Sequence, residues 1–180
     1  MSDDRFQNKY RIESARASWH DYDGGSYFIT ICTKNREHFF GEIENGGMVL
    51  SDIGKYVTEQ FGNVSMHYPY AEIPLFTIMP NHVHIIVVID GNKTEYDRRM
   101  VETWRAASLQ DIAKLQGWLS VVIGGLKSSI TRFANEKQID FSWQPRFHDH
   151  IIRDNSEMNR IASYIENNVA NWVDDEFYTP

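Results

Sequence analysis

Two histidines, His82 and His84, stand two residues apart at the head of the apolar run 85–89. Apolar β-branched runs of this kind predict a strand, and side chains of a strand alternate between its two faces. Both imidazoles therefore point to the same face, where together they could bind one divalent cation. A bare pair of this spacing is also typical of two polar residues at a strand end, so other residues must decide between these interpretations.

The residues before the pair predict where in the sheet it lies. Pro80 cannot donate a ladder hydrogen bond and belongs at a strand end or edge, and Asn81 is suited to a tight turn. We therefore expect His82 and His84 at the point where a hairpin enters the sheet, on rigid backbone.

A second group of candidate residues lies about 80 positions later, on a predicted helix that begins at a cap formed by Asn155 or Ser156 and extends to about residue 173. Its apolar stripe comprises Met158, Ile161, Ala162, Ile165, Val169 and Trp172. Tyr164 and Asn168 are four residues apart on the flank of this stripe, one above the other. If the stripe packs on the face of the sheet that carries the histidines, the phenol and the amide meet the imidazoles.

Such a set of groups has a coherent chemistry. Two imidazole nitrogens and the amide oxygen of Asn168 would bind Mg²⁺ or Mn²⁺ and leave positions for substrate oxygens. The phenol of Tyr164 becomes a nucleophile where its anion is favoured, and its attack on phosphorus would give a phosphotyrosine bond and a free hydroxyl. Taken singly, Tyr164 is typical of a packing residue and Asn168 of a solvated one. Their position relative to the histidines decides whether they are structural residues or part of a catalytic site.

The composition sets bounds on these hypotheses. The 180 residues are 42% hydrophobic and 13% aromatic, enough for a packed core in one domain. The single Cys32 and the absence of a long apolar run predict a soluble, cytoplasmic protein. The formal net charge of −7 disfavours non-specific nucleic-acid binding but permits a local basic groove. The acidic residues 174–176 lie away from the candidate site in sequence.

The remaining elements predict an α+β fold. Strands are expected over 26–33, 71–79, the histidine segment and the end of 141–152, a hairpin or loop over 39–50, and helices from Ser51 to about 64, over 108–135 and over 155–173. Gly117 and Gly124-Gly125 predict a break in the long helix. This order favours a split βαβ sandwich over residues 1–180, preceded by an arm of residues 1–25 and interrupted by a polar loop or flexible insertion over 91–107.

Five motifs together resemble a known family. They are Tyr27-Phe28-Ile29-Thr30-Ile31-Cys32-Thr33 with Asn35-Arg36, Met79-Pro80-Asn81-His82-Val83-His84, Gly125-Leu126-Lys127-Ser128, the segment 143–153 (WQPRFHDHIIR) and Tyr164-Ile165-Glu166-Asn167-Asn168. The chain resembles the single-tyrosine HUH transposases of bacterial insertion sequences, most closely the REP-associated tyrosine transposases. The resemblance extends over roughly residues 10–172 in the order of the family.

The resemblance implies a ferredoxin-like fold with an antiparallel sheet, a bound Mg²⁺ or Mn²⁺, and a homodimer. It also implies transposition and recombination of DNA, with single strands cleaved and rejoined at hairpin-marked sites through a 5′-phosphotyrosine intermediate. The metal ligands of the family correspond to His82, His84 and Asn168, and its nucleophile to Tyr164. The proline that often follows the asparagine is replaced here by Val169, which predicts that the helix continues straight past the site.

Cationic and aromatic residues near the fourth strand and on the long helix are candidates for DNA binding. They are Trp143, Arg146, His150 and Arg153 near the strand, and Lys127 and Arg132 on the helix. Bases of single-stranded DNA could stack on Trp143, and the arginines could hold phosphates. The alternative is that Trp143 belongs to the core and that the arginines pair with Asp149 and Asp154.

Three functions remain open from the sequence. The first is the strand-transferring enzyme just described. The second is a domesticated relative that binds structured nucleic acid without chemistry, which the acidic balance and Val169 favour. The third is a metallohydrolase of small phosphodiesters that uses water as the nucleophile.

Overall fold

The computed structural model describes residues 24–93 and 107–179, with side chains from residue 117 onward in the second range. Nearly all of the predicted N-terminal arm (1–25) and most of the polar stretch 91–107 lie outside these residues. Within the described part of the chain, no helix has both the length and the apolar character needed to cross a membrane.

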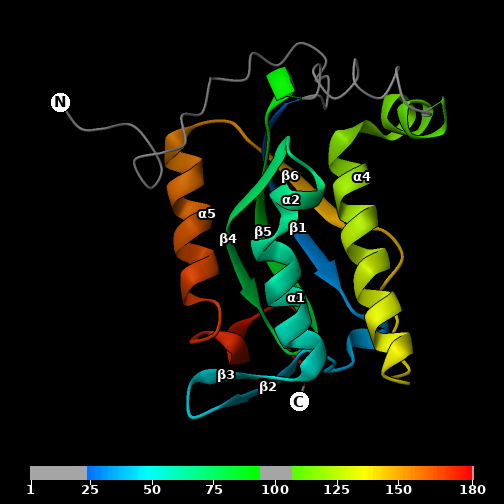
Figure 1. Ribbon diagram of the computed structural model, residues 1–180. Helices are drawn as coiled ribbons and strands as arrows, with labels where there is room; N and C mark the ends of the chain where they lie inside the picture. Colours follow the sequence, from blue (N-terminus) through cyan, green and yellow to red (C-terminus); the bar gives the residue numbers. More distant parts are fainter. Residues whose placement is uncertain (1–23, 94–106, 180) are drawn as a thin grey trace.

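A four-stranded antiparallel sheet forms the centre of the fold (Figure 1). Its strands are β1 (Gly25–Cys32), β4 (Ala71–Ile78), β5 (His82–Ile89) and β6 (His148–Ile152), in the spatial order β4-β5-β1-β6. This order, with β4 and β5 joined as a hairpin and β1 between β5 and β6, is the arrangement of a split βαβ unit. The predicted ferredoxin-like α+β fold is confirmed.

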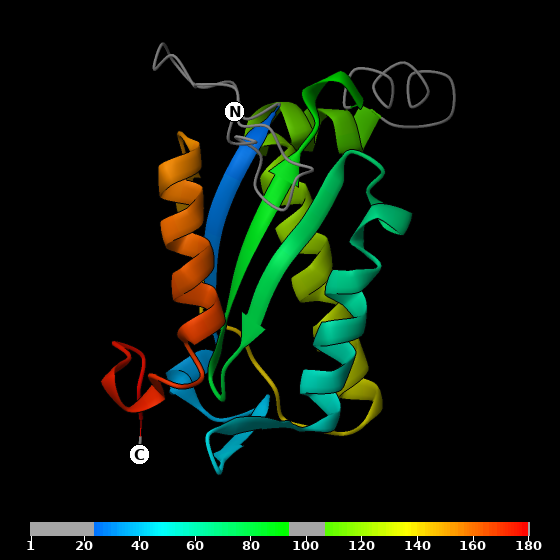
Figure 2. The same cartoon turned by 90° about the vertical axis from the view of Figure 1, so that its left-hand side faces the viewer.

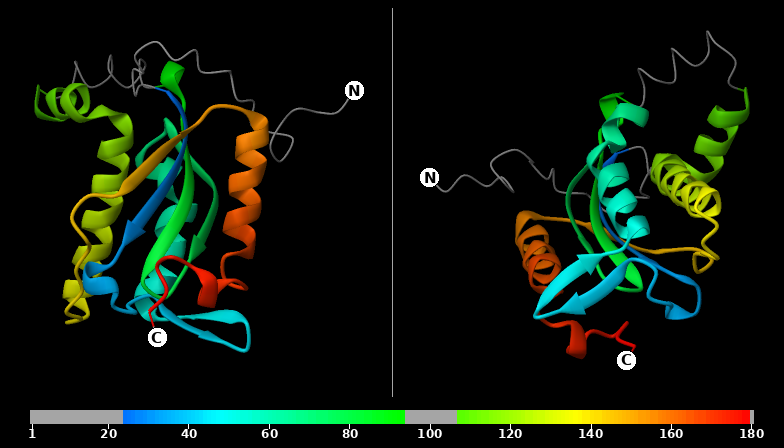
Figure 3. Two further views of the ribbon diagram at one scale, coloured as in Figure 1. Left: turned by 180° about the vertical axis from the view of Figure 1, so that it is seen from behind. Right: turned by 60° about the horizontal axis from the view of Figure 1, so that its bottom comes forward.

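Helices cover both faces of the sheet, as Figure 2 and the right-hand view of Figure 3 show. The helices α1 (Asp52–Gly62) and α4 (Ala107–Glu136) pack side by side on one face, with the short α2 (Val64–His67) beyond α1. The helix α5 (Asn155–Asn167) lies alone on the other face. The helix that carries Tyr164 therefore packs on the sheet apart from the other helices.

Alternation along the central strands separates two cores. Tyr27, Ile29 and Ile31 of β1 face α1 and α4, and they are at most 1% exposed. The other set of β1 and β5 side chains, which includes Phe28 and Ile86, faces α5. The buried residues of this second core are Ile86, Ile152, Met158, Ile161, Ala162 and Ile165. Met158, Ile161, Ala162 and Ile165 of the predicted apolar stripe thus form the surface by which α5 packs on the sheet, whereas Val169 and Trp172 lie beyond the end of the helix.

The segment 39–50 forms the small hairpin β2 (Gly41–Glu44) and β3 (Gly47–Leu50). Its two loop residues, Asn45 and Gly46, have φ of 51° and 77°. Asn-Gly with both φ values positive is the preferred chemistry of a type I′ hairpin turn. This confirms the hairpin among the two expectations for this segment.

The helix α1 begins as the sequence predicts. The Ser51 hydroxyl accepts a hydrogen bond from Gly54 N at 3.1 Å, which satisfies one of the free amides of the first turn. Gly54 itself packs against the Phe40 carbonyl so closely that a Cβ would overlap it. The glycine inside this helix is explained by that backbone contact.

The break predicted in the long helix is only partly confirmed. Gly117 has φ 72° and ψ 154°, so the two parts of α4 meet at a kink there. The helix continues without interruption through Gly124 and Gly125. Gly125 is needed for space, because a Cβ at this position would overlap the Tyr68 hydroxyl.

The last helix differs from its prediction at both ends. Its N-cap is Asp154, whose carboxylate accepts from Glu157 N at 2.8 Å, and not Asn155 or Ser156. It ends at Asn167, and a turn and the 3-10 helix η2 (Trp172–Asp174) follow. Trp172 is 8% exposed after this turn, in ring contact with His82. The free energy gained by burying this indole is greater than that gained by extending the helix. The predicted straight continuation is therefore wrong, although position 169 holds valine and not proline.

The cap of α5 allows a first prediction. Asp154→Ala should lower the free energy of unfolding by about 1 kcal/mol, because the Glu157 amide loses its partner at the helix end. Urea denaturation would measure this change, and Asp154→Asn, which keeps the acceptor oxygen, should lose less. Equal losses in both variants would contradict a capping role.

Candidate functional site

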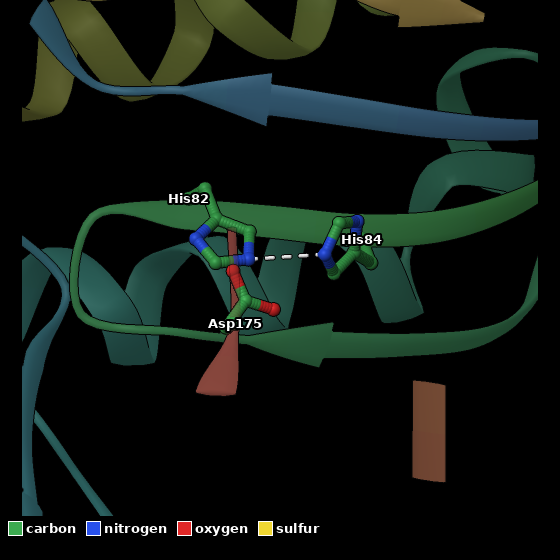
Figure 4. A group of neighbouring side chains, drawn as sticks. All are labelled: His82, His84 and Asp175. Atoms are coloured by element: carbon green, nitrogen blue, oxygen red, sulfur yellow. Dashed lines mark hydrogen bonds between the residues drawn. The ribbon is translucent and has the colours of Figure 1, made fainter. Parts of the chain in front are cut away.

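The two histidines lie at the start of β5, immediately after the hairpin turn, and both are buried. Their Nε2 atoms are 3.0 Å apart, and Figure 4 shows both rings directed to one point together with Asp175. In the sheet, His84 is paired with Thr30 and His82 with Cys32 of β1. The predicted common orientation of the two imidazoles is confirmed.

Each imidazole is oriented by a hydrogen bond on its other nitrogen. Nδ1 of His82 is 2.8 Å from Oδ1 of Asn81, and Nδ1 of His84 is 2.8 Å from Oγ1 of Thr30. An amide oxygen only accepts, so Nδ1 of His82 carries the proton and its Nε2 presents a lone pair. Such outer contacts are the usual way in which a metal-binding histidine is held.

Both imidazoles are uncharged at neutral pH. Burial, together with the neighbouring His84 and Arg36, lowers the pKa of His82 to about 2. Burial also lowers the pKa of His84 to about 4, although the Asp175 carboxylate opposes this shift. Protons therefore do not compete with a cation for the Nε2 atoms near pH 7.

Tyr164 reaches the histidines from α5 of the same chain. Its hydroxyl is 3.2 Å from Nε2 of His84 and 3.3 Å from Oδ2 of Asp175, to which it donates. Its side chain is 42% exposed, so solvent or a substrate can reach it. Burial of the hydroxyl and the negative charge of Asp175 raise the pKa of Tyr164 to about 12. The free site thus holds the phenol protonated.

Asn168 is the C-cap residue of α5, and it is 2% exposed rather than solvated. Its Nδ2 donates to Oδ2 of Asp175 at 2.8 Å. Its Oδ1 is buried and has no hydrogen-bond partner among the described atoms. A buried amide oxygen without a partner is costly in a folded protein unless a ligand completes it.

These groups fit a hexacoordinate divalent cation. One ligand atom from each of His82, His84 and Asp175 lies within 4.8 Å of the others. Two ligands at right angles, each about 2.1 Å from an ion, are about 3.0 Å apart, which matches the spacing of the two Nε2 atoms. Together with the free oxygen of Asn168, these residues offer the mixed nitrogen and oxygen donors of a divalent-metal site.

Some of the candidate DNA-binding residues have structural contacts. Nζ of Lys127 donates to the carbonyls of Gln144 and Arg146, and burial lowers its pKa. Trp143 is partly buried in the core, with its Nε1 donating to the Lys127 carbonyl. These contacts agree with the core alternative for Trp143, and they show Lys127 supporting the loop before β6.

The other candidates are exposed. Arg132 lies on α4, on the opposite face of the sheet from α5. His150 on β6 contacts Glu157 at 2.8 Å. Among the side chains that the structure describes, Arg146 and Arg153 form no ion pair, so the expected pairing with Asp149 and Asp154 is not found. These two arginines remain candidates for phosphate contacts.

Three further residues of the site are not identified by the sequence patterns. The position of Asn81 predicts only a turn, yet this residue is fully buried and holds His82. Thr30 belongs to a strand motif, but its contact with His84 depends on the register between β1 and β5. Asp175 lies far from the histidines in sequence, among other acidic residues. No signal in the sequence identifies it, because the turn after α5 brings it back to the histidines.

The low pKa values of the histidines predict how stability depends on pH. Both groups titrate near 6.5 when unfolded and lower when folded, so the unfolded chain binds protons first as pH falls. Their stabilising effect is complete above pH 6.5 and is lost progressively below it. We expect the free energy of unfolding at pH 5 to be lower than at pH 7 by on the order of 2 kcal/mol for each histidine.

Urea denaturation in EDTA at pH 7, 6 and 5 would measure this loss. The exposed His67 on α2 lies outside the site, so His67→Ala provides a control for the loss of an imidazole elsewhere in the chain. A free energy of unfolding that is constant over this range would show that folding does not lower the pKa values of the two imidazoles.

Comparisons with known proteins agree with the motifs. No family model matches the chain. An uncharacterized protein of Haemophilus influenzae is 37% identical over 156 residues, which are 86% of this chain and 85% of that protein. Another protein of the same organism, named "Putative REP-associated tyrosine transposase", is 22% identical over 153 residues, or 79% of this chain and 68% of that protein.

A solved structure shares the fold. It is a REP-associated tyrosine transposase bound to a REP hairpin, and it superposes with a TM-score of 0.54 at 18% identity, over 93% of this chain and 76% of the other. The resemblance indicated by the motifs is therefore confirmed. The chain belongs to the family of the 37% identical Haemophilus influenzae protein, and its more distant relative and its structural neighbour are both named as REP-associated tyrosine transposases.

Proposed function

We propose that the protein is a metal-dependent transposase and endonuclease of single-stranded DNA. It cleaves and rejoins strands at hairpin-marked sites through a 5′-phosphotyrosine intermediate. The observation that carries the proposal is the 3.2 Å between the Tyr164 hydroxyl and Nε2 of His84, within one chain. A nucleophile beside a pair of metal-binding imidazoles is the arrangement that such a reaction needs.

In this mechanism Tyr164 attacks the phosphorus of the scissile phosphodiester. The new bond joins the phenol oxygen to the 5′ phosphate, and the bond to the 3′ oxygen breaks. The 3′ oxygen keeps the electron pair and gains a proton, while the phenol loses its own. Because one ester replaces another, a 3′ hydroxyl can attack the phosphotyrosine and rejoin the strand without ATP.

His82, His84 and Asn168 would hold the cation. Mg²⁺ or Mn²⁺ bound there would stabilise the negative charge that develops on a phosphate oxygen in the transition state. Thr30 and Asn81 keep the two imidazoles in place, so their Nε2 atoms need no rearrangement when the cation enters.

Two shallow hollows beside the site would hold the DNA strand. One, of about 430 Å³, lies along β6 and is lined by residues that include Phe28, Arg36 and His150. The other, of about 310 Å³, is lined by residues that include Arg146 and the loop before β6. The two hollows share Thr30 and His148. A strand along them would pass the face that bears His84 and meet cationic side chains.

A homodimer is not required to complete the active site, since Tyr164 faces the histidines of its own chain. The homodimer that the family resemblance implies and the cytoplasmic location that the composition predicts are both included in the proposed function. Analytical ultracentrifugation with and without hairpin DNA would test the dimer.

One observation favours a second candidate function, a domesticated module that binds structured nucleic acid without chemistry. The hollow at Tyr164 is also lined by Asp174, Asp175 and Glu176, and the pKa of the phenol is raised to about 12. A binding module would retain affinity for hairpin DNA in EDTA and form no covalent product.

Incubation with hairpin-flanked single strands tests the proposal. The full chain is mixed with 5′- or 3′-labelled DNA in Mg²⁺, in Mn²⁺ or in EDTA, and the products are separated on a denaturing gel. We expect a protein–DNA adduct only where a divalent cation is present. The adduct should carry the 3′ label and not the 5′ label, because the fragment joined through its 5′ phosphate keeps the 3′ end of the strand. Hairpin binding without any adduct would favour the second function.

A further inference from the structure

The chain beyond α5 returns to the candidate site. This C-terminal strap, residues 169–179, runs back along the base of β5, as the left-hand view of Figure 3 shows. It places the carboxylate of Asp175 beside His82 and His84 (Figure 4), with the three ligand atoms within 4.8 Å of one another. Nothing in the family motifs assigns a role to this residue.

The strap is fastened on both sides of Asp175. Trp172 and Phe177 are 8% and 7% exposed, and both rings pack near His82. Nδ2 of Asn81 donates to the Phe177 carbonyl at 2.9 Å, so the residue that orients His82 also holds the strap. The Arg36 guanidinium donates to the Glu176 carbonyl at 2.8 Å. The position of the carboxylate is therefore set by the same packing that sets the imidazoles.

The contacts of Asp175 place it among the reacting groups. Oδ2 accepts from the Tyr164 hydroxyl and from Asn168 Nδ2, while Oδ1 accepts from Phe177 N at 2.7 Å. Asn168 thus turns its donor toward Asp175, and its buried oxygen has no partner among the described atoms. The Asp175 carboxylate therefore accepts a hydrogen bond from the Asn168 amide, whose own oxygen is free to bind a cation.

The hollow beside the candidate site is acidic. It is lined by the carboxyl groups of Asp174, Asp175 and Glu176 together with Tyr164 and Asn168. The nearby Arg36 directs its guanidinium at a carbonyl and at the ring of Phe177. A phosphodiester at Tyr164 would be repelled by three carboxylates. A divalent cation among His82, His84 and Asp175 would attract both the carboxylate and the phosphodiester, and it would offset their mutual repulsion.

We infer that Asp175 is a carboxylate ligand of the metal centre, supplied by the C-terminal strap and oriented by Asn168. This inference rests on the proposed metal-dependent function. Two imidazoles and an amide carry no charge, whereas Mg²⁺ and Mn²⁺ favour sites that contain a carboxylate. The strap then contributes to cation affinity and holds the cation next to the nucleophile.

Binding of Mn²⁺ alone to the full chain tests the inference. Electron paramagnetic resonance of free Mn²⁺ would be recorded during titration of the wild type, Asp175→Asn, Asp175→Glu and Asp174→Asn, without DNA. Asp174 is an exposed residue of the same hollow, so Asp174→Asn removes the same charge one position away. We expect Asp175→Asn to weaken Mn²⁺ binding about tenfold or more, Asp175→Glu to restore part of it, and Asp174→Asn to resemble the wild type.

The adduct assay then separates the possible failures. If the wild type binds Mn²⁺ and forms the adduct but Asp175→Asn binds Mn²⁺ equally well, Asp175 is not a ligand. If Asp175→Asn forms more adduct than the wild type, the strap is instead a cover that DNA displaces, and the inference is overturned. A wild type without Mn²⁺ binding or adduct would overturn the proposed function as well. Thermal unfolding in EDTA shows that each variant is folded.

Discussion

Tyr164→Phe should abolish the covalent protein–DNA adduct. The substitution removes only the hydroxyl that lies 3.2 Å from Nε2 of His84, and no other group is proposed to attack phosphorus. The expected loss is roughly 10⁴-fold or below detection, because removal of a nucleophile leaves only positioning and charge stabilisation. Denaturing gels with labelled hairpin-flanked strands would measure the adduct.

Binding controls show whether the loss is chemical. Phenylalanine keeps the edge-on ring contact with Phe28, and the side chain is 42% exposed, so the fold should be retained. We expect the affinities of Tyr164→Phe for hairpin DNA and for Mn²⁺ to equal those of the wild type. Strand cleavage that persists without an adduct would instead show that water is the nucleophile, as in a metallohydrolase.

Loss of the cation site should have the next largest effect. His84→Ala removes one of two imidazoles whose Nε2 atoms are 3.0 Å apart, and with it the group nearest to the Tyr164 hydroxyl. Because even outer contacts of a metal site are worth about 10- to 100-fold in affinity, loss of a ligand should weaken Mn²⁺ binding by about 10²-fold or more. Adduct formation should fall to the level of the wild type in EDTA.

The exposed His67 provides the matched control for this substitution. His67→Ala removes an imidazole from α2, a helix beyond α1 on the opposite face of the sheet from α5. It should bind Mn²⁺ and form adduct like the wild type. Full adduct formation by His84→Ala at the same Mn²⁺ concentration would show that the histidine pair does not hold the cation of the reaction.

The local elements of this protein are readable from its sequence because short-range rules dominate in them. Alternation of side chains along β5 places both imidazoles on one face. The Asn45-Gly46 turn and the Ser51 cap use the residues that those conformations prefer. The apolar stripe of α5 identifies its buried surface, and Tyr164 is found on the flank of that stripe.

Other features depend on contacts that no local pattern encodes. The glycine at position 125 of α4 gives room to the Tyr68 hydroxyl from another part of the chain, and the helix passes through it without a break. The end of α5 at Asn167 follows from burial of Trp172 against His82, which outweighs the helical propensity of the next residues. Trp143 is drawn into ring contacts with Phe40 and Phe141.

The sequence alone determined the split βαβ order of elements, the shared orientation of His82 and His84, and the spacing of Tyr164 and Asn168. It did so because strand and helix periods are properties of consecutive residues. Packing of the whole chain, and not a local pattern, brings Thr30 to His84 across 54 residues and Asp175 to both imidazoles. Asn81 is adjacent to His82 in sequence, yet its side chain is fully buried and also holds the strap through the Phe177 carbonyl. These arrangements arise from sheet register and from burial of the strap, which depend on the whole packed core.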